Sequence, residues 1–371
     1  MRIRSISLYH FDKPFVIGFN SPHRLRNKAD SLIVKFEFEE GLSGYGESVP
    51  RPYVTGETCS SAAGIIRDVF SGLLFKAEFN NLEDASDILE KIETVCRSKS
   101  IPAYNSALGA VDIALIDALG KLLKKPARDF LGPAARKEIP CAVSIPFLSP
   151  AEYQYAAEEL KKMPFDSFKI ILGADEEENR NRLRLIRTVL GDKKDLRAEA
   201  NGKWSREQAL SNIQMLKEFN VSGIEQPLPK GDLEGMRQIR KRTGMSIIAD
   251  ESLCSLEDAV RLIEKEACDI LNIKISKCGG LLRSWQIVQL AESRGVLCQL
   301  GSHVGETEIL SYAGRHLAAA VRNLTYFENG SHLLFEKNWD YSRTDFLALP
   351  FGNGLCNPGL ALPREYVVIS P

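Results

Sequence analysis

The chain has 371 residues, of which 44% are hydrophobic and 26% are charged, and both values are ordinary for a globular protein. With 48 basic and 49 acidic residues the formal net charge is −1, which gives no electrostatic case for binding nucleic acid or an anionic membrane. We therefore expect the partner to be a small molecule or another protein subunit, and the length suggests two domains, or a large domain with a smaller attachment.

The cysteines and the N-terminal residues predict a cytoplasmic protein. None of the eight cysteines forms a C-x-x-C pair, so neither a zinc knuckle nor a thioredoxin-type site is indicated, and we interpret them as reduced, mostly buried thiols. The opening stretch MRIRSISLYHFDKPF has no apolar signal-peptide core. No apolar run approaches the roughly 18 residues that a membrane span requires.

Residues 1–130 are predicted to form an α+β domain. RIRSISLYHF alternates like a strand, and DSLIVKFEFEEGLSGYGE is typical of two strands joined by a glycine turn. Helices are expected over residues 57–75, 83–97 and 104–125, the last having apolar residues at helical spacing. We interpret Asp112 and Asp117 in this last helix as structural polar contacts.

From about residue 138, short apolar runs alternate with longer amphipathic helices. Eight runs follow one another: IPCAVSI, SFKIILG, DLRAEAN, VSGIEQP, SIIADES, CDILNIKIS, VLCQLGS and LTYFENG. This alternation predicts a (β/α)8-type TIM barrel over residues 131–330. A doubly wound sheet is the alternative, but it would place a glycine-rich phosphate loop after the first strand, and VSIPFLSPAEY is not one. Residues 331–371 are expected to return to the N-terminal domain.

Polar residues recur near the carboxyl ends of these predicted strands. Glu199, Glu225, Asp250 and Lys274 follow one another at intervals of 24 to 26 residues, about the length of one βα unit. They are therefore expected at the same height, at the mouth of the barrel. Three carboxylates converging there require a cation, and oxygen ligands without Cys or His favour Mg²⁺, with Mn²⁺ as the alternative. Capping of the following helices explains any one of these acids but not all three.

Two lysines lie in otherwise apolar runs, and a buried lysine needs a partner. Lys274, close to a divalent cation and partly desolvated, is expected to have a lowered pKa and to act as a base. The metal would bind a substrate carboxylate and stabilise the enediolate formed when the α-proton leaves. Lys169 is the second lysine, in the run SFKIILG.

At this point the sequence resembles the enolase superfamily, specifically its muconate lactonizing enzyme subgroup, of the mandelate racemase/muconate lactonizing enzyme type. The resemblance rests on GLSGYGESVPRPYVTGET, IEQPLP, IIADESL, DILNIKISKCGG and NPGLAL, in this order along the chain. It implies a modified, enolase-like barrel under an α+β capping domain that supplies specificity loops. It also implies Glu225 and Asp250 as metal ligands and Lys274 as the base of the sixth strand.

Two positions depart from the family pattern. The third strand carries Glu199 in EAN where the family usually has aspartate, although Asn201 follows as in the family. The second strand usually reads Lys-x-Lys before a glycine, and here it reads Lys169-Ile170-Ile171. The resemblance implies that Lys169 assists the metal site, but the second lysine, usually a base on one face of the substrate, is Ile171.

The resemblance also suggests substrate contacts, each of which has a plainer alternative as a helix-start, loop or surface residue. These candidates are Asn201, Ser302, His303 and Glu328 in the barrel, and Arg24 and Arg51 in the cap. The Asp-x-Asp of dipeptide epimerases is absent from the eighth strand, where the sequence reads YFENGS.

The main hypothesis is an Mg²⁺-dependent isomerase or carbon–oxygen lyase that abstracts the α-proton of a small carboxylate substrate. With one base, Lys274, cycloisomerisation or β-elimination is expected. The alternative is an epimerase or racemase acting on dipeptides or N-acyl amino acids with an unconventional second base, Lys169 or His303. A catalytically degenerate barrel acting as a binding protein is a third hypothesis. We also expect a homo-oligomer.

Overall fold

The computed structural model describes residues 1–21, 24–149, 152, 160–161, 163, 165–328, 350, 352–355 and 367–371, without the side chains of residues 17, 20, 21, 24 and 25. No helix in these ranges combines the length and apolarity of a membrane span. The seven cysteines that the ranges contain are free thiols. The predicted C-terminal segment, residues 331–371, lies mostly outside the described residues.

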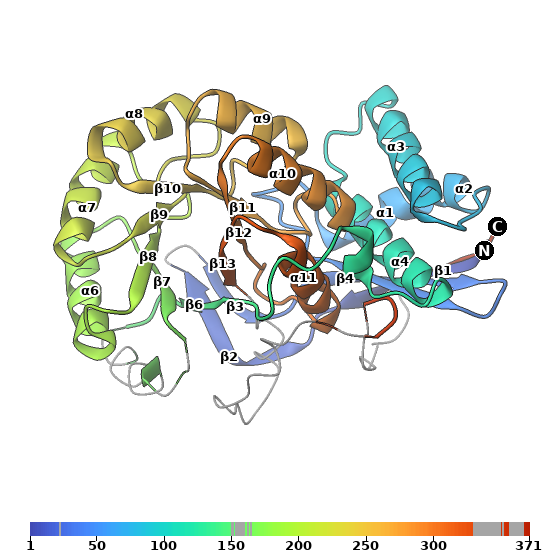
Figure 1. Cartoon of the computed structure of the whole chain (residues 1–371), viewed down its shortest axis with the longest axis horizontal. Helices are drawn as coiled ribbons and strands as arrows, with labels where there is room; N and C mark the ends of the chain where they lie inside the picture. Colours follow the sequence, from blue (N-terminus) through green and yellow to red (C-terminus); the bar gives the residue numbers. More distant parts are fainter. Residues whose placement is uncertain are drawn as a thin grey trace.

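The N-terminal part is an α+β capping domain, whose helices and main sheet are drawn at the right of Figure 1 and whose strands β2 and β3 lie below the barrel strands. Its sheet has the order β14-β1-β4-β5, and β2 and β3 form a separate antiparallel hairpin. The strands are β1 (Ile3–Phe11), β2 (Pro14–Ser21), β3 (Arg24–Lys28), β4 (Ser31–Phe38), β5 (Ser43–Ser48) and β14 (Val367–Ile369). The helices are α1 (Cys59–Ile65), η1 (Ile66–Phe70), α2 (Ser71–Leu74), α3 (Leu82–Ser98), α4 (Asn105–Leu122) and η2 (Ala127–Phe130). The three predicted helical segments are present, and one turn of the first, η1, is π-helical.

Two glycines allow α4 to lie directly on the capping sheet. A Cβ at Gly46 would lie 1.9 Å from the carbonyl oxygen of Ala110, and one at Gly44 would lie 2.1 Å from that of Ala114. Since these contacts are with backbone atoms, no side chain fits at either position. The stretch SGYGES is therefore a docking surface for the small residues of α4.

The C-terminal part is a closed barrel of eight parallel strands, ringed by helices at the left of Figure 1. The strands are β6 (Cys141–Ile145), β7 (Ser167–Ile171), β8 (Asp195–Glu199), β9 (Gly223–Glu225), β10 (Ser246–Ala249), β11 (Ile270–Ile273), β12 (Leu297–Leu300) and β13 (Leu324–Glu328). The helices are α6 (Glu176–Leu190), α7 (Arg206–Glu218), α8 (Leu233–Thr243), α9 (Leu256–Glu264), α10 (Leu281–Ser293) and α11 (Glu308–Ala320). Each of the eight apolar runs forms one strand, so the predicted barrel is confirmed.

The end of the chain lies against its beginning. In β14, Val367 to Ile369 pair antiparallel with Leu8 to Ile6 of β1. The backbone N–H of Leu355 donates to Asp117 of α4, which also accepts from the backbone N–H of Tyr45. Asp117 is thus a structural polar contact, as predicted, and the described C-terminal residues lie on the capping domain.

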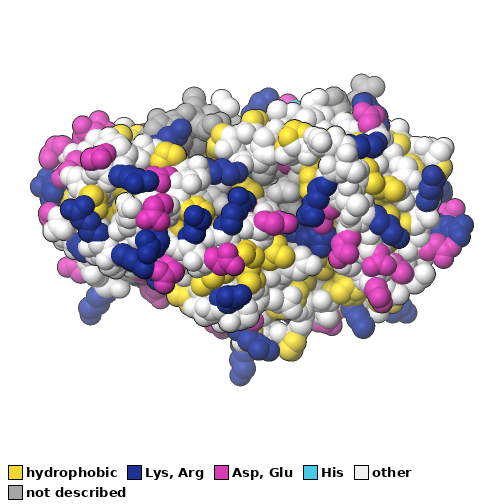
Figure 2. All heavy atoms as spheres, turned by 90° about the horizontal axis from the view of Figure 1, so that it is seen from above, with side chains coloured by type: hydrophobic (Ala, Val, Ile, Leu, Met, Phe, Trp, Pro, Cys, Tyr) yellow, Lys and Arg dark blue, Asp and Glu magenta, His cyan; other side chains and the backbone are white. Residues whose placement is uncertain are grey.

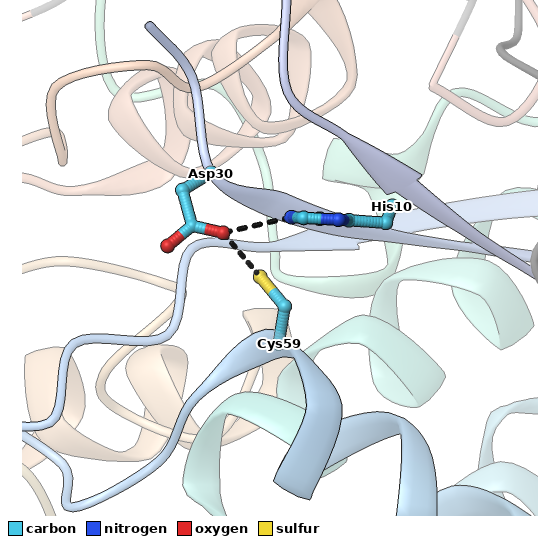
Figure 3. A group of neighbouring side chains, drawn as sticks. All are labelled: His10, Asp30 and Cys59. Carbon is cyan, nitrogen blue, oxygen red and sulfur yellow. Dashed lines mark hydrogen bonds and ion pairs between the residues drawn. The ribbon is translucent and has the colours of Figure 1, made fainter.

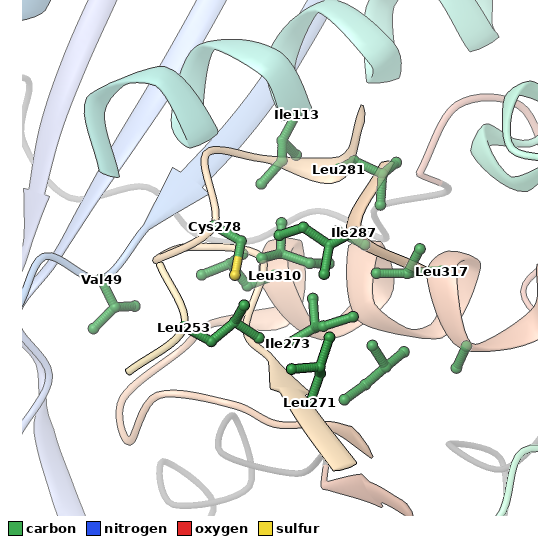
Figure 4. Packing of buried hydrophobic residues seen from close by; sticks show 14 of the residues in the cluster. Val49, Ile113, Leu253, Leu271, Ile273, Cys278, Leu281, Ile287, Leu310 and Leu317 are labelled. Carbon is green, nitrogen blue, oxygen red and sulfur yellow. The ribbon is translucent and has the colours of Figure 1, made fainter. Parts of the chain in front are cut away.

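One cluster of buried hydrophobic residues is shared by the cap and the barrel. Figure 4 shows Val49 and Ile113 of the capping domain around the same core as Leu281 and Leu317 of the barrel helices. The two parts therefore have a common apolar interface. On the face shown in Figure 2, basic and acidic side chains are interspersed, consistent with a net charge near zero.

Carboxylates from the capping domain cap the N-termini of two barrel helices. Helix α10 has no side-chain cap of its own at Gly280, and the backbone N–H groups of Leu281 and Leu282 donate to Asp112 of α4 at 2.8 and 3.1 Å. Similarly, Glu47 of β5 accepts from the backbone N–H groups of Thr307 and Leu310 at the start of α11. Both carboxylates are buried, so the cap stabilises the positive ends of these helices.

Replacing Asp112 with alanine is expected to lower the free energy of unfolding by about 2–4 kcal/mol, because two buried N–H groups would lose their acceptor. Chemical denaturation measures this change. Asp112→Asn keeps one acceptor oxygen and should cost less, and Asp87→Ala on the exposed side of α3 should stay within about 0.5 kcal/mol. A loss at Asp112→Ala no larger than that at Asp87→Ala would contradict the capping role.

Candidate functional site

The carboxyl ends of neighbouring strands place the candidate residues in one layer. Glu199 and Glu225 are the last residues of β8 and β9, and Asp250 and Lys274 come directly after β10 and β11. The strand register pairs Ile171 with Glu199 and Glu199 with Glu225. Residues in register on neighbouring parallel strands point to the same side of the sheet, so these side chains lie together inside the barrel near its C-terminal mouth.

Three carboxylates converge at this mouth. Single oxygen atoms of Glu199, Asp250 and Glu251 lie within 4.8 Å of one another, and all three residues are buried. Two lysines balance part of this charge: Lys274 Nζ lies 2.7 Å from Asp250 Oδ2, and Lys277 Nζ lies 2.8 Å from Asp250 Oδ1. The cluster contains Glu251, which was not expected from the sequence, and metal binding by Glu225 stays a prediction.

Glu225 lies beside this cluster and accepts three hydrogen bonds. Its Oε2 accepts from Lys169 Nζ at 3.0 Å and from Gln299 Nε2 at 2.8 Å, and its Oε1 accepts from Asn272 Nδ2 at 2.7 Å. The carboxylate is completely buried.

Burial and mutual repulsion set the protonation of the acids. Burial raises the pKa of Glu199 to about 8, with a further contribution from the charge of Glu225. Burial, followed by the charge of Asp250, raises the pKa of Glu251 to about 7. Burial would also raise the pKa of Asp250, but Lys274 and Lys277 outweigh it and hold that pKa well below its usual value.

The carboxylates around Lys274 determine the direction of its pKa in the metal-free chain. Burial would lower it, but Asp250, Glu225 and Glu199 outweigh burial and raise the pKa well above its ordinary value. The expectation assumed that a divalent cation neutralises these acids. A lowered pKa of Lys274 beside a bound cation therefore stays a prediction.

The donor set fits a hard divalent cation. All the converging ligand atoms are carboxylate oxygens. Glu251 Oε2 and Asn201 Oδ1 are buried and accept no hydrogen bond within the described part of the chain. Buried acceptors of this kind are costly unless they are paired, and a cation with its water ligands would pair them.

Lys169 lies one layer below the cluster. It is in register with Arg197, two residues before the layer of Ile171 and Glu199. Its Nζ is 3.0 Å from Glu199, 3.0 Å from Glu225 and 2.8 Å from Glu328, all measured to Oε2. Burial would lower the pKa of Lys169, but these carboxylates outweigh it and raise that pKa far above its ordinary value. The amine is therefore a charged partner of three acids.

Ile171 occupies the wall opposite Lys274. Strands β7 and β11 are four steps apart in the closed ring of eight. Ile171 is buried and apolar at the level of Glu199. The side of the site facing Lys274 thus has a hydrocarbon side chain in the layer of Glu199.

His303 lies on the same side of the barrel as Lys274, because it follows β12, the neighbour of β11. Its ring is buried, and neither ring nitrogen has a hydrogen-bond partner among the described residues. Burial, with the nearby charge of Lys274, lowers the pKa of His303 well below its usual value. Its backbone N–H donates to Glu306 Oε1 at 2.5 Å, which fixes the loop. A neutral, unpaired imidazole is available to a ligand.

The other residues proposed from the sequence have varied surroundings. Asn201 has a positive φ of 49° and donates to Glu199 Oε1 at 2.6 Å, so it orients that carboxylate. Ser302 lines a small cavity together with Glu306 and Glu328. Glu328 is buried and bonds Lys169 and Arg197, with Arg197 NH1 3.1 Å from its Oε1. It belongs to the interior of the barrel, not to a surface loop.

The last two residues proposed from the sequence are arginines of the capping domain. Arg51 is buried, and its guanidinium donates to the backbone carbonyls of Asp30, Pro50 and Val304. These bonds join the cap to the loop that carries His303. The backbone of Arg24 begins β3, but its side chain lies outside the described part of the structure. Substrate contact by either arginine stays a prediction.

Four buried polar residues of the site were not predicted from the sequence. They are Glu251, Asn272, Lys277 and Gln299. Signals were present for two of them, since Glu251 directly follows Asp250 and Asn272 is two residues before Lys274, on the same face of the strand. Lys277 and Gln299 become recognisable only when the fold brings them to Asp250 and Glu225.

Comparison with known families gives matches over most of the chain. Residues 8–132 match the family of mandelate racemase/muconate lactonizing enzyme N-terminal domains. Residues 152–355 match the family of enolase C-terminal domain-like proteins.

Curated relatives and solved structures agree with these matches. A hydrophobic dipeptide epimerase of Enterococcus faecalis is 34% identical, over 80% of this chain and 81% of its own length. An N-succinyl-L-Arg/Lys racemase of Bacillus cereus is 30% identical, over 91% of this chain and 89% of its own. The E. faecalis dipeptide epimerase solved with Mg and L-Leu-L-Tyr superposes with a TM-score of 0.85 at 30% identity, covering 96% of this chain and 99% of that one. The chain therefore belongs to the mandelate racemase/muconate lactonizing enzyme subgroup of the enolase superfamily.

Proposed function

We propose that this protein is an Mg²⁺-dependent epimerase or racemase that deprotonates the α-carbon of a dipeptide or an N-acylated amino acid. The observation that carries the proposal is Lys274, a buried amine 2.7 Å from Asp250 in a cluster of buried carboxylates. The substrate class is supported by the relatives, whose names include dipeptide epimerases and an N-succinyl amino acid racemase. This substrate class replaces the broader carboxylate expected from the sequence.

Each side chain of the mouth has a part in this proposal. Glu199, Asp250 and Glu251 would hold the ion, and Glu225 would join them by giving up a bond to Lys169 or Asn272. The bound ion would supply positive charge to the substrate carboxylate when the α-proton leaves. Lys274 takes that proton, since the neutralised acids would no longer hold its pKa high.

Epimerisation also requires a proton from the opposite face of the planar α-carbon. His303 is badly placed for this task, because it lies on the side of Lys274. On the opposite wall the described amine is Lys169, one layer lower than the usual family lysine. In this proposal Lys169 delivers the second proton once Glu199 and Glu225 turn towards the ion.

A second candidate function follows from one specific observation, the isoleucine at position 171. With no amine in that layer, one-base chemistry by Lys274, a cycloisomerisation or a β-elimination, needs no help from Lys169. His303, neutral and unpaired on the same side, would then be available to the departing group. The degenerate-barrel hypothesis is less favoured, because the cluster and Lys274 are assembled. Homo-oligomerisation stays a prediction.

The test is α-hydrogen exchange in deuterated water, followed by mass spectrometry and chiral chromatography. The panel contains dipeptides and N-succinyl amino acids of both configurations, each with Mg²⁺ and with a chelator. The epimerase proposal predicts Mg²⁺-dependent deuterium uptake with inversion. Exchange without inversion would favour the one-base alternative, and no exchange with any member would overturn the proposed substrate class.

A further inference from the structure

A second group of potential metal ligands lies in the capping domain, away from the barrel mouth. Figure 3 shows the side chains of His10, Asp30 and Cys59 pointing towards one another. His10 Nε2 is 2.9 Å from Asp30 Oδ1, and Cys59 Sγ is 3.2 Å from the same oxygen. One ligand atom from each residue lies within 4.8 Å of the other two.

The fold brings these residues together from three separate elements. His10 is the penultimate residue of β1, Asp30 lies in the two-residue turn between β3 and β4, and Cys59 is the first residue of α1. The backbone of Asp30 is held by Arg51, whose NH1 donates to the Asp30 carbonyl at 3.2 Å. The group is thus anchored on the sheet, on a helix and on an arginine that also binds the loop of Val304.

The donor types and their spacing suit a borderline transition metal. Imidazole nitrogen, carboxylate oxygen and thiolate sulfur are the three ligand types of zinc, whose bonds of about 2.0–2.3 Å place neighbouring ligand atoms roughly 3.2–3.8 Å apart. The two observed distances, 2.9 and 3.2 Å, are within a few tenths of an ångström of that range. Small rotations of the His10 and Cys59 side chains would therefore open space for an ion.

From this geometry we propose that His10, Asp30 and Cys59 form a transition-metal site, with Zn²⁺ as the preferred ion and water as the fourth ligand. The side chains of His10 and Asp30 are 42% and 53% exposed, so an ion and its water can enter from solvent, while Cys59 closes the inner side. The all-oxygen cluster of the barrel favours Mg²⁺, so the two sites differ in the ions they select.

Charge balance supports this assignment. An Asp30 carboxylate and a Cys59 thiolate together neutralise a divalent ion. In the metal-free site the Cys59 thiol donates to Asp30 Oδ1 at 3.2 Å, so the sulfur carries a proton. Metal binding breaks the S–H bond, forms the metal–sulfur bond and releases one proton to the solvent.

An occupied site would join the base of the β2–β3 hairpin to α1. His10 and Asp30 flank this hairpin in the sequence, and α1 follows the loop that contains Arg51. The consequence is a measurable stabilisation of the capping domain by zinc, independent of Mg²⁺.

The test uses the full chain, first treated with chelator and then titrated with Co²⁺ as a spectroscopic probe and with Zn²⁺ in competition. We expect a thiolate-to-Co²⁺ charge-transfer band in the near ultraviolet, release of protons, loss of the band on adding Zn²⁺, and a higher melting temperature with Zn²⁺. Cys59→Ser should abolish the band, and His10→Gln and Asp30→Asn should weaken binding by about 10- to 100-fold or more.

Controls separate this site from the barrel site and from general effects. Asp250→Asn should leave the thiolate band unchanged, because the barrel cluster has no sulfur ligand. Asp12→Asn, an exposed acid near the hairpin, should also leave it unchanged. Absence of a thiolate band in the folded wild-type protein, or its persistence in Cys59→Ser, would overturn the proposal. Neither result depends on the reaction proposed for the barrel.

Discussion

Replacing Lys274 with methionine is expected to lower the rate of α-hydrogen exchange by about 10²–10⁴-fold, the range typical of a lost general base. Methionine fills a similar volume without an amine. The Lys274 amine lies 2.7 Å from the Asp250 carboxylate. The Lys277 amine lies 2.8 Å from the same carboxylate, but it also donates to the backbone carbonyl of Asp250 and is therefore held in place. Exchange is measured by mass spectrometry at saturating Mg²⁺.

Lys274→Arg is the matched control for this prediction. It keeps a positive charge beside Asp250 but cannot lose its proton at neutral pH, so it should be as inactive as Lys274→Met. Mg²⁺ affinity, measured by calorimetry, should be retained in the arginine variant. Exchange at more than a tenth of the wild-type rate in a folded Lys274→Met protein would rule out Lys274 as the base.

Replacing Ile171 with lysine is expected to increase the rate of epimerisation relative to exchange, by about 10²-fold for a well-placed second acid. The new amine would enter the layer of Glu199 on the wall opposite Lys274. Its charge would be compensated by neighbouring carboxylates, which limits the cost of burial. Chiral chromatography of the products measures inversion, and deuterium uptake measures exchange.

Ile171→Met is the control, because it changes the shape of the side chain without adding an amine. It should leave the ratio of inversion to exchange at the wild-type value. If Lys169 delivers the second proton in the native enzyme, Lys169→Met should remove inversion from the wild type, and Ile171→Lys should restore part of it. An unchanged ratio in a folded Ile171→Lys variant would contradict the idea that the missing amine limits the reaction.

The barrel could be predicted from the sequence because its signals are local. Strands buried on both faces are continuous apolar runs, and a regular βα unit gives residues at strand ends a nearly constant spacing. This spacing predicts that Glu199, Asp250 and Lys274 lie in one layer at the strand ends, and all three are found there. The departure at Ile171 was likewise visible, because alternation along a strand assigns each side chain to a face.

The details that escaped prediction depend on contacts between distant parts of the chain. The hydrogen bonds that Glu225 accepts from Gln299 and Asn272, on two other strands, have no signal in the sequence around Glu225. Nothing in the local pattern around Asp112 says that it caps a helix 170 residues away. The pKa of Lys274 depends in the same way on contacts between distant residues, since it is set by the sum of the charges in the assembled mouth.

The carboxylates of Asp112 and Glu47 have a consequence for modular exchange within the superfamily. The loops carrying Lys274 and His303 lead into α10 and α11, and both helices start on acids supplied by the cap. A chimaera that combined this barrel with the cap of a relative would therefore need carboxylates at the same two positions. Without these carboxylates, a chimaera intended to change only the substrate preference would also displace Lys274, so that changing the cap would change the reaction rate as well as the substrate.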